Sequence, residues 1–245
     1  MPFDDPRDFL EHLEERKELL RITAEVDPKF DIGAYIRKTS DQQGPALLFE
    51  NVKGSGMAVA GGIFATRARV LMALETDKEA VYERFYDGVT HPIPPRLIET
   101  GPCKDVILTG EAVDLETLPI PTYALKDGGA FITHGVQISK DPETGTKNAS
   151  IYRMQLQGKR QMGILCEGYH DLYRQYVKAE AKDEPLEVAV ALGVDPVIML
   201  ATQVRAGYGQ DEMEIAGGLR RKPVDLVKCE TVDLEVPATA EIVIE

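Results

Sequence analysis

Residues 148–212 contain three side-chain types that together suit a divalent cation carrying a phosphate group. Asn148 offers an amide oxygen, His170 a ring nitrogen and Glu212 a carboxylate. Such donors suit Mn²⁺ or Mg²⁺ and leave coordination positions for phosphate oxygens and water. Arg153 follows close behind Asn148, and its guanidinium can pair with a carboxylate through two hydrogen bonds. If these residues converge in space, the sequence predicts a metal- and phosphate-binding site beside a carboxylate-binding site.

Each of these residues also has a structural interpretation. Asn148 at the start of a strand is typical of a turn, and His170 is a polar residue just before a helix. Glu212 at a helix start interacts favourably with the helix dipole, and Arg153 on a strand can simply face solvent. One further histidine, His134, lies in a glycine-rich loop and is a candidate pocket residue.

The first hundred residues alternate strands and helices. Apolar spacing and turn residues predict helices over 5–17, 31–40, 66–74 and 77–86, and strands over 19–22, 46–50 and 57–60. Asp31 is expected to cap the second helix. The alternation indicates an α/β layer, and the proline-rich segment 91–102 is expected to be a linker.

The rest of the chain is richer in strands. The pattern predicts strands over 106–108, 135–139, 149–157, 161–165, 186–192, 224–227 and 241–244, and helices over 171–182, 196–203 and 212–219. Short turns between the strands favour an antiparallel barrel or sandwich. We therefore expect an α+β protein with domains over 1–105 and 106–245.

Strand alternation would give the segment around Arg153 two distinct faces. In a continuous strand over 149–157, Ile151, Arg153 and Gln155 share one face, and Tyr152 and Met154 the other.

Composition excludes several classes of function. The net charge of −13 disfavours binding to nucleic acid or to anionic membranes. The sequence lacks both the glycine-rich dinucleotide motif and the P-loop motif. The most apolar stretch, 188–201, is interrupted by Gly193, Asp195 and Pro196, so we expect no membrane span.

Cysteine usage and the N-terminus indicate a cytoplasmic protein. The cysteines are odd in number and far apart, which favours free thiols over disulfides or structural zinc: Cys103, Cys166 and Cys229. The acidic N-terminus lacks the apolar core of a secretion signal.

Over nearly its whole length the chain resembles the N-terminal and central part of the UbiD-family (de)carboxylases. The similarity is carried by Asp5–Ile22, Gly44–Lys53, Asn148–Gln155, Val188–Pro196 and Asp233–Val243. The resemblance implies a split β-barrel flavin-binding domain over 106–245. The stretch Gly163–Tyr169 departs from the common family pattern.

The resemblance also implies prenylated FMN as cofactor, with its phosphate held by Mn²⁺ or Mg²⁺. Asn148, His170 and Glu212 match the family's metal ligands, and Arg153 matches the arginine that meets the substrate carboxylate. The cofactor is then lined by residues of three segments: Asn148, Ser150, Ile151, Tyr152 and Arg153; Tyr169 and His170; and Glu212. A K⁺ ion would be bound by Ala201, Thr202 and Val204.

The expected activity is reversible, non-oxidative decarboxylation of a small aromatic or α,β-unsaturated carboxylic acid. In the family, the proton-transferring acidic residues follow the segment similar to Glu241–Glu245. We therefore expect a chain truncated before its C-terminal domain that is inactive alone. Its expected partners are further copies of itself or a complementing C-terminal subunit. Two alternatives remain: a non-catalytic cofactor-binding or assembly subunit, and an ordinary flavin oxidoreductase, for which no nicotinamide site is visible.

Overall fold

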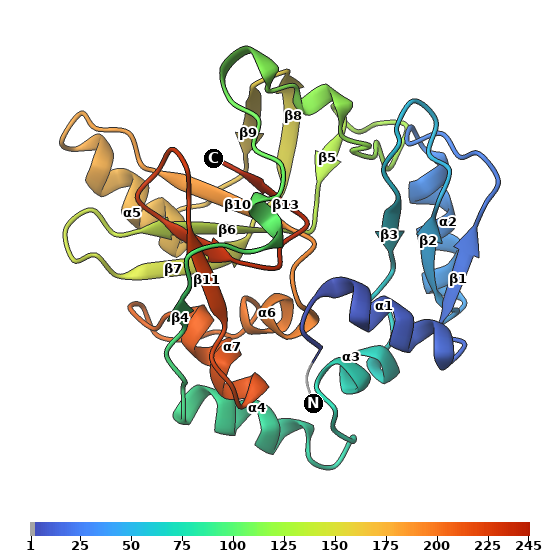
Figure 1. The fold of residues 1–245 in the computed structure, drawn as a ribbon, viewed down its shortest axis with the longest axis horizontal. Coiled ribbons are helices and arrows are strands. Elements are labelled where there is room, and N and C mark those ends of the chain that lie inside the picture. Colours follow the sequence, from blue (N-terminus) through green and yellow to red (C-terminus); the bar gives the residue numbers. More distant parts are fainter. Residues whose placement is uncertain (1–2) are drawn as a thin grey trace.

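The computed structural model describes residues 3–245, which form a mixed α/β fold built on four sheets (Figure 1). In the N-terminal sheet, β1 (Leu19–Ile22) and β2 (Ala46–Phe49) are parallel, and β3 (Val59–Gly61) pairs antiparallel with β2. The chain crosses from β1 to β2 through α2 (Asp31–Asp41). This parallel crossover confirms the predicted α/β layer.

Two helices of the first half begin at residues whose side chains cap the helix N-terminus. Asp5 accepts hydrogen bonds from the backbone N–H groups of Arg7 and Asp8, so α1 (Pro6–Glu15) starts at a proline behind an aspartate cap. Thr66 accepts from the N–H of Arg69 at the start of α3 (Arg67–Ala73). A fourth helix, α4 (Val81–Thr90), completes this half.

The second half contains two antiparallel sheets that meet near residue 152. One has the order β13-β10-β6-β7 and the other the order β5-β8-β9. The first comprises β13 (Ile242–Ile244), β10 (Val188–Leu192), β6 (Gly135–Lys140) and β7 (Lys147–Ile151). The second comprises β5 (Phe131–Ile132), β8 (Met154–Gly158) and β9 (Gln161–Ile164).

A third sheet of this half joins distant parts of the chain. It comprises β12 (Glu235–Pro237), β11 (Asp225–Lys228) and β4 (Arg96–Leu97), with β4 parallel to β11. The remaining helices are α5 (Asp171–Glu180), α6 (Pro196–Ala201) and α7 (Glu212–Arg220). Short 3₁₀ turns occupy Pro102–Lys104, Gly110–Ala112 and Leu115–Thr117.

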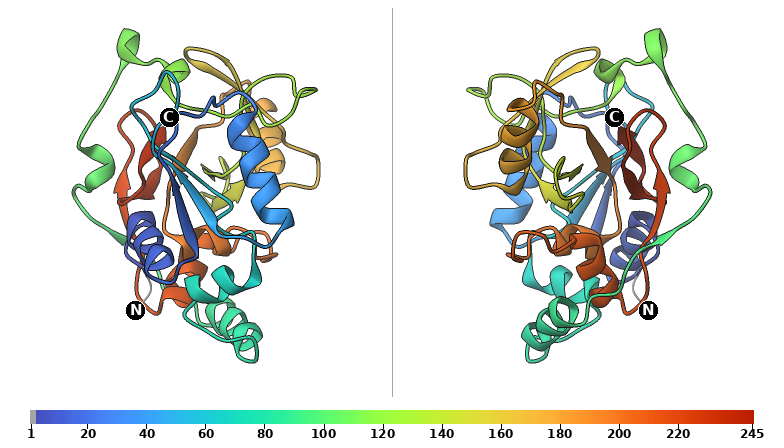
Figure 2. Two further views of the ribbon diagram at one scale, coloured as in Figure 1. Left: turned by 90° about the vertical axis from the view of Figure 1, so that its right-hand side faces the viewer. Right: turned by 90° about the vertical axis from the view of Figure 1, so that its left-hand side faces the viewer.

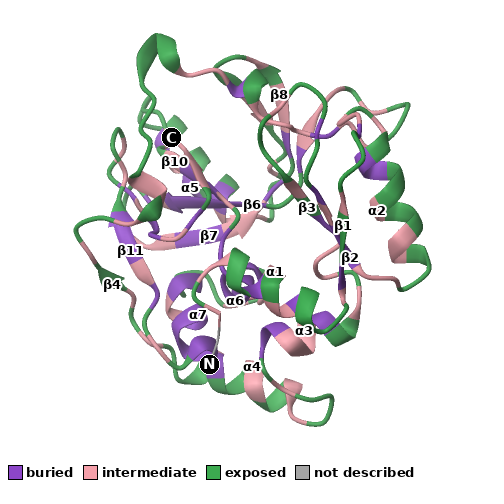
Figure 3. Cartoon of the chain, turned by 45° about the vertical axis from the view of Figure 1, so that its right-hand side comes forward, coloured by how far each residue is buried: buried purple, intermediate pink, exposed green. Residues whose placement is uncertain are grey.

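The largest hydrophobic cluster lies under α6 and α7, where the purple, buried part of the ribbon concentrates (Figure 3). Every residue of α7 except Glu214 is buried. Two glycines let α4 and the segment that follows it approach α7 closely. A Cβ at Gly217 would lie 2.3 Å from the carbonyl oxygen of Ile93, and one at Gly218 would lie 2.5 Å from that of Gly88. Because no side chain fits there, this helix contact requires glycine.

Several element predictions were wrong in position or kind. Residues 106–108 form no strand; they belong to an exposed segment along the outside of the molecule, green in Figure 2. The short strands β4, β5 and β12 were not predicted, and α4 begins at Val81 rather than Asp77. Asp31 does not cap α2. Phe30 occupies that position, and Asp31 instead accepts the N–H of Asp27 at 3.0 Å.

The predicted strand over 149–157 is two strands, β7 and β8, which belong to different sheets. The predicted linker contains β4 and so is partly regular. The boundary near residue 105 stays a prediction, although α4 packs on α7 and β4 pairs with β11 before that point. None of the four sheets closes on itself within residues 3–245, so the split barrel also stays a prediction.

Within the described part of the chain, every helix is too short or too polar to cross a lipid bilayer.

Candidate functional site

The candidate site is organised around β7, the edge strand of its sheet. Strand alternation places Asn148 and Ser150 on one face and Ala149 and Ile151 on the other. Ala149 and Ile151 contact the main hydrophobic cluster. The opposite face is covered by α5, which packs against β7.

Two helix N-termini converge on this strand, and Figure 1 shows β7 between α5 and α7. His170 is the N-cap residue of α5, and Glu212 is the first residue of α7. The Glu212 Oε2 atom accepts the N–H of Ala149 at 2.8 Å. The His170 ring lies 4.8 Å from the Tyr152 ring, centroid to centroid. Residues 148–152 thus contact the N-termini of both α5 and α7. The three predicted metal ligands, Asn148, His170 and Glu212, therefore lie in the same region of the molecule.

The Glu212 carboxylate is unusual because it is buried and has no cationic partner among residues 3–245. Its residue is 8% exposed. Burial raises the pKa of Glu212 to about 7, although the backbone N–H groups of Ala149 and Glu212 itself act in the opposite direction. A buried carboxylate of this kind is stabilised in its charged form by a bound cation.

Asn148 lies beside this carboxylate and is also incompletely satisfied. Its Oδ1 atom accepts a hydrogen bond from Ser150 Oγ at 3.3 Å, whereas its buried Nδ2 atom has no partner among the described residues. An amide oxygen next to a buried carboxylate fits a cation, and the orphaned N–H₂ group fits an acceptor such as a phosphate oxygen. The residues present therefore fit the predicted metal and phosphate.

His170 is less ready than the other two to bind a metal. Its Nδ1 atom accepts the backbone N–H of Glu167 at 2.9 Å, so a neutral ring carries its proton on Nε2. Coordination through Nδ1 requires that hydrogen bond to be exchanged. Residues 3–245 hold no cluster of three or more His, Cys, Asp or Glu able to bind a metal. The predicted ligands, Asn148, His170 and Glu212, include an amide and so fall outside that definition. Their assignment as metal ligands stays a prediction.

Arg153 sits where the chain passes from β7 into β8. Its guanidinium carbon lies 4.8 Å from the centre of the Phe131 ring, and its carbonyl accepts the N–H of Leu165. The crossing is held by the buried side chain of Gln137, which donates to the Tyr152 carbonyl at 3.0 Å and accepts the Tyr152 N–H at 2.6 Å. These two hydrogen bonds from Gln137 to Tyr152, called here the Gln137 clamp, hold the backbone just after β7 ends at Ile151, so the single strand predicted over 149–157 is interrupted at Tyr152 and Arg153.

Gln137→Leu should lower the free energy of unfolding by about 2 kcal/mol, because it leaves a buried N–H and a buried C=O of Tyr152 without partners. Chemical denaturation measures the change. Gln42→Leu, at an exposed position, is the matched control and should change stability by less than about 0.5 kcal/mol. Equal effects of the two substitutions would show that the clamp contributes little.

The predicted monovalent-cation residues lie at the C-terminal end of α6. The carbonyls of Ala201 and Val204 accept the N–H groups of Val204 and Ala206, and Thr202 Oγ1 donates to the Met199 carbonyl at 2.8 Å. Helix C-termini favour cations, but these oxygens already have protein partners, so this assignment also stays a prediction.

His134 lines a cavity of about 980 Å³ between the two halves of the chain, as the sequence predicted. Its ring packs edge-on against Phe64, with centroids 5.7 Å apart. The surrounding protein lowers the pKa of His134, which keeps the ring neutral near pH 7. Phe131, which stacks under Arg153, also lines this cavity. Arg153 therefore stands next to a space large enough for a small organic molecule.

Sequence reasoning missed two residues that position this site. Gln137 is one. The other is Asp141, 1% exposed, which accepts hydrogen bonds from Lys178 Nζ of α5 and from the hydroxyl of Tyr208 in the loop before α7. The three residues are far apart in the chain, so no local pattern could reveal the contact.

Comparisons with known proteins point in one direction. The family model described as the UbiD 3-octaprenyl-4-hydroxybenzoate carboxy-lyase N-terminal domain matches residues 10–88, and the Rift-related domain of the same carboxy-lyase matches residues 96–245. An uncharacterized protein of Synechocystis is 37% identical over 98% of this chain and 53% of its own length. The anhydromevalonate phosphate decarboxylase of Methanothermobacter thermautotrophicus is 35% identical over 98% and 54%, respectively.

Solved structures agree with these matches. The UbiD-class enzyme HmfF from Pelotomaculum thermopropionicum, in complex with FMN, is 41% identical with a TM-score of 0.93, covering 98% of this chain and 54% of HmfF. The closed form of Sedimentibacter hydroxybenzoicus vanillic acid decarboxylase is 31% identical with a TM-score of 0.92, covering 99% and 54%. The chain thus spans about half the length of the relatives it matches.

Proposed function

The chain belongs to the UbiD family, and we propose that it is the cofactor-binding part of a reversible, non-oxidative decarboxylase that uses prenylated FMN. The observation that carries this proposal is the meeting of two helix N-termini at β7, around an unpaired buried carboxylate and an orphaned amide. The complexes of the HmfF structures with FMN and with prenylated FMN support it.

Asn148, His170 and Glu212 would bind a Mn²⁺ or Mg²⁺ ion that bridges to the cofactor phosphate. Ser150, Ile151, Tyr152 and Tyr169 would contact the cofactor. Tyr169 is largely exposed, and its ring lies 4.3 Å from that of His170, which places it beside a proposed metal ligand. Ala201, Thr202 and Val204 would bind K⁺.

When bound, prenylated FMN supplies the electron sink for the carbanion left by loss of CO₂. Arg153 orients the substrate carboxylate, and its stacking on Phe131 limits the directions in which the guanidinium can point. His134 and the apolar cavity walls exclude water from the substrate ring. A carboxylic acid must protonate the product carbon. In the family, the acidic residues that do this follow the segment similar to Glu241–Glu245.

The proposed substrate is a small aromatic or α,β-unsaturated carboxylic acid. The vanillic acid decarboxylase among the matched structures supports an aromatic acid. We place the protein in the cytoplasm, acting as a homo-oligomer or with a complementing chain. A second candidate is a cofactor-binding subunit without catalytic activity of its own, which needs a partner chain.

Mn²⁺ titration tests the proposal directly. Loss of the free-ion EPR signal should report one Mn²⁺ bound per chain. Asn148→Ala should weaken that binding about 30-fold, since loss of even an outer-shell partner of a metal ligand typically costs ten- to a hundredfold in affinity. Asn51→Ala, at an exposed position, is the control and should leave it unchanged. FMN fluorescence should be quenched on binding in the presence of Mn²⁺ and recover with EDTA. Mn²⁺ binding that ignores Asn148→Ala would refute the site.

A further inference from the structure

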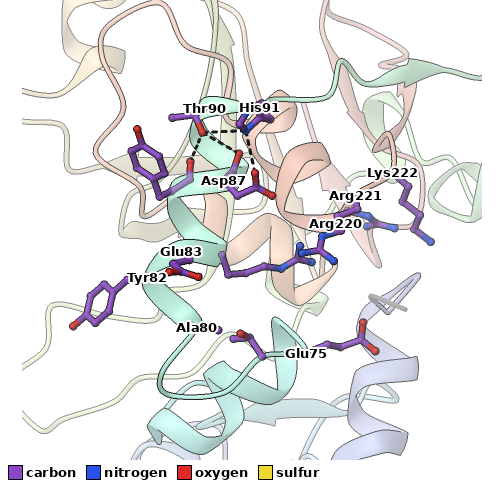
Figure 4. Close-up of a pocket in the computed structure, with 13 residues that line it drawn as sticks. Glu75, Ala80, Tyr82, Glu83, Asp87, Thr90, His91, Arg220, Arg221 and Lys222 are labelled. Carbon is purple, nitrogen blue, oxygen red and sulfur yellow. Dashed lines mark hydrogen bonds and ion pairs between the residues drawn. The ribbon is translucent and has the colours of Figure 1, made fainter.

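A second pocket, of about 1030 Å³, lies between α4 and the C-terminal end of α7 (Figure 4). Glu212 begins α7 and Arg220 ends it, so this pocket and the candidate metal site lie at opposite ends of one helix, about 12 Å apart along its axis. The close glycine contacts between α4 and α7 fix the two walls relative to each other.

Four cationic residues line this pocket: Arg84, Arg220, Arg221 and Lys222. Two of them are already neutralised. Arg220 pairs with the buried carboxylate of Asp195, and Lys222 pairs with Asp4. Figure 4 shows Arg220 and Arg221 side by side at the helix end, across from α4.

The other two, Arg84 and Arg221, lack such partners. Within residues 3–245 neither side chain makes a hydrogen bond or an ion pair, and the Arg84 Nη1 atom is shielded from water without an acceptor. Most arginines of this acidic chain are paired with carboxylates, as Arg7, Arg21 and Arg96 are. An unpaired, shielded guanidinium beside a second arginine is costly unless an anion joins it.

The electrostatics of Arg84 agree with this geometry. Burial, and after it the charge of Arg221, lower the pKa of Arg84, while Asp87 and Glu75 act in the opposite direction. Asp87 is itself engaged by His91 Nδ1 at 3.0 Å. Among residues 3–245, neither Glu83 nor Asp87 forms a hydrogen bond or ion pair with the Arg84 guanidinium, and its Nη1 atom has no acceptor.

We propose that Arg84 and Arg221 form a binding site for a phosphate-type oxyanion, separate from the candidate metal site at β7. A tetrahedral dianion can accept hydrogen bonds from both guanidinium groups and offset their repulsion. The source is either inorganic phosphate or the phosphate of an ester. Tyr82 and Tyr86 also line the pocket, but each lies two residues from Arg84 and therefore on the opposite face of α4, and Figure 4 shows Tyr82 pointing away from Arg220 and Arg221.

Calorimetric titration in EDTA tests this site without the metal site's contribution. Inorganic phosphate and phenyl phosphate are the two probes. We expect saturable binding to the full chain, weakened about tenfold by Arg84→Met and by Arg221→Met, since each removes charge-assisted hydrogen bonds. Tighter binding of phenyl phosphate than of inorganic phosphate would identify an ester as the source, and equal binding of both probes would identify free phosphate.

Three controls separate the outcomes. Arg37→Met removes an exposed arginine elsewhere and should leave phosphate binding unchanged. Arg84→Met should be no less stable than the parent without phosphate, because it removes an unpaired charge, so lost binding cannot be attributed to misfolding. Glu212→Gln should leave binding intact. The proposal would be overturned if Glu212→Gln abolished phosphate binding, or if both arginine variants kept it. Loss of binding in Glu212→Gln would still allow the function proposed for β7.

Discussion

Arg69→Met should lower the free energy of unfolding by about 4 kcal/mol, the cost expected when one partner of a buried charged network is removed. Arg69 is fully buried. Its guanidinium donates to three backbone carbonyls, those of Gly44, Gly62 and Ile63, and to Glu18. This single side chain ties α3 to the loops that precede and follow the β2-β3 pair.

Methionine fills similar space but donates no hydrogen bond. The carbonyls of Gly44 and Ile63 would be left unpaired, and Glu18, which is partly exposed, would turn to solvent. Arg21→Met is the matched control. Arg21 also pairs with two carboxylates, but on the surface, and its loss should cost less than about 1 kcal/mol. Equal costs in urea denaturation would show that burial of Arg69 does not matter.

In the metal-free protein, the free energy of unfolding should fall by about 3 kcal/mol as the pH rises through the pKa of Glu212, and Glu212→Gln should abolish this fall. The pKa of Glu212 is raised by burial to about 7, from a usual value of 4.5. Protonated Glu212 is therefore favoured by folding. Its contribution is complete below about pH 4.5 and is lost as the pH rises through 7, since the folded chain must then bury a charge.

The measurement compares the free energies of unfolding of parent and variant in EDTA at pH 5.5 and pH 8.5. About 2 of the 3 kcal/mol should be lost within this window, because the unfolded carboxyl is already largely ionised at pH 5.5. Asp195, whose pKa burial raises to about 6, titrates in both proteins, so the difference isolates Glu212. Glu214→Gln, on the same helix, is the control. Mn²⁺ should stabilise the parent more at pH 8.5 than at pH 5.5, because the ion binds the charged carboxylate. A parent–variant difference that does not change with pH would contradict the raised pKa.

Local patterns in the sequence identified most elements because their causes are local. The apolar spacing of Phe9 and Leu13 and the cap at Asp5 are enough for α1, and the apolar run at Leu19–Ile22 is enough for β1. The errors arise where distant residues decide. Gln137 holds the backbone just after β7 ends at Ile151, and no neighbour of Tyr152 in the sequence signals this. Val106–Leu108 has a strand-like composition but no partner strand.

The candidate site was predictable in its residue types and not in its environment. Asn148, His170 and Glu212 were chosen for their ligand chemistry and family resemblance, and the fold draws their segments together at β7. That Glu212 is buried without a cation, and that His170 already uses Nδ1, depends on the packing of α5 and α7. The mixed α/β fold and the family are confirmed, while the metal and cofactor contacts stay predictions.

The Gln137 clamp has a consequence for how this scaffold can diversify. Gln137 hydrogen-bonds only main-chain atoms of Tyr152, so the path of the backbone between the two sheets does not depend on the side chain of the adjacent residue, Arg153. A substitution at Arg153 should therefore change how the carboxylate is bound and leave the path of the backbone between the two sheets unchanged.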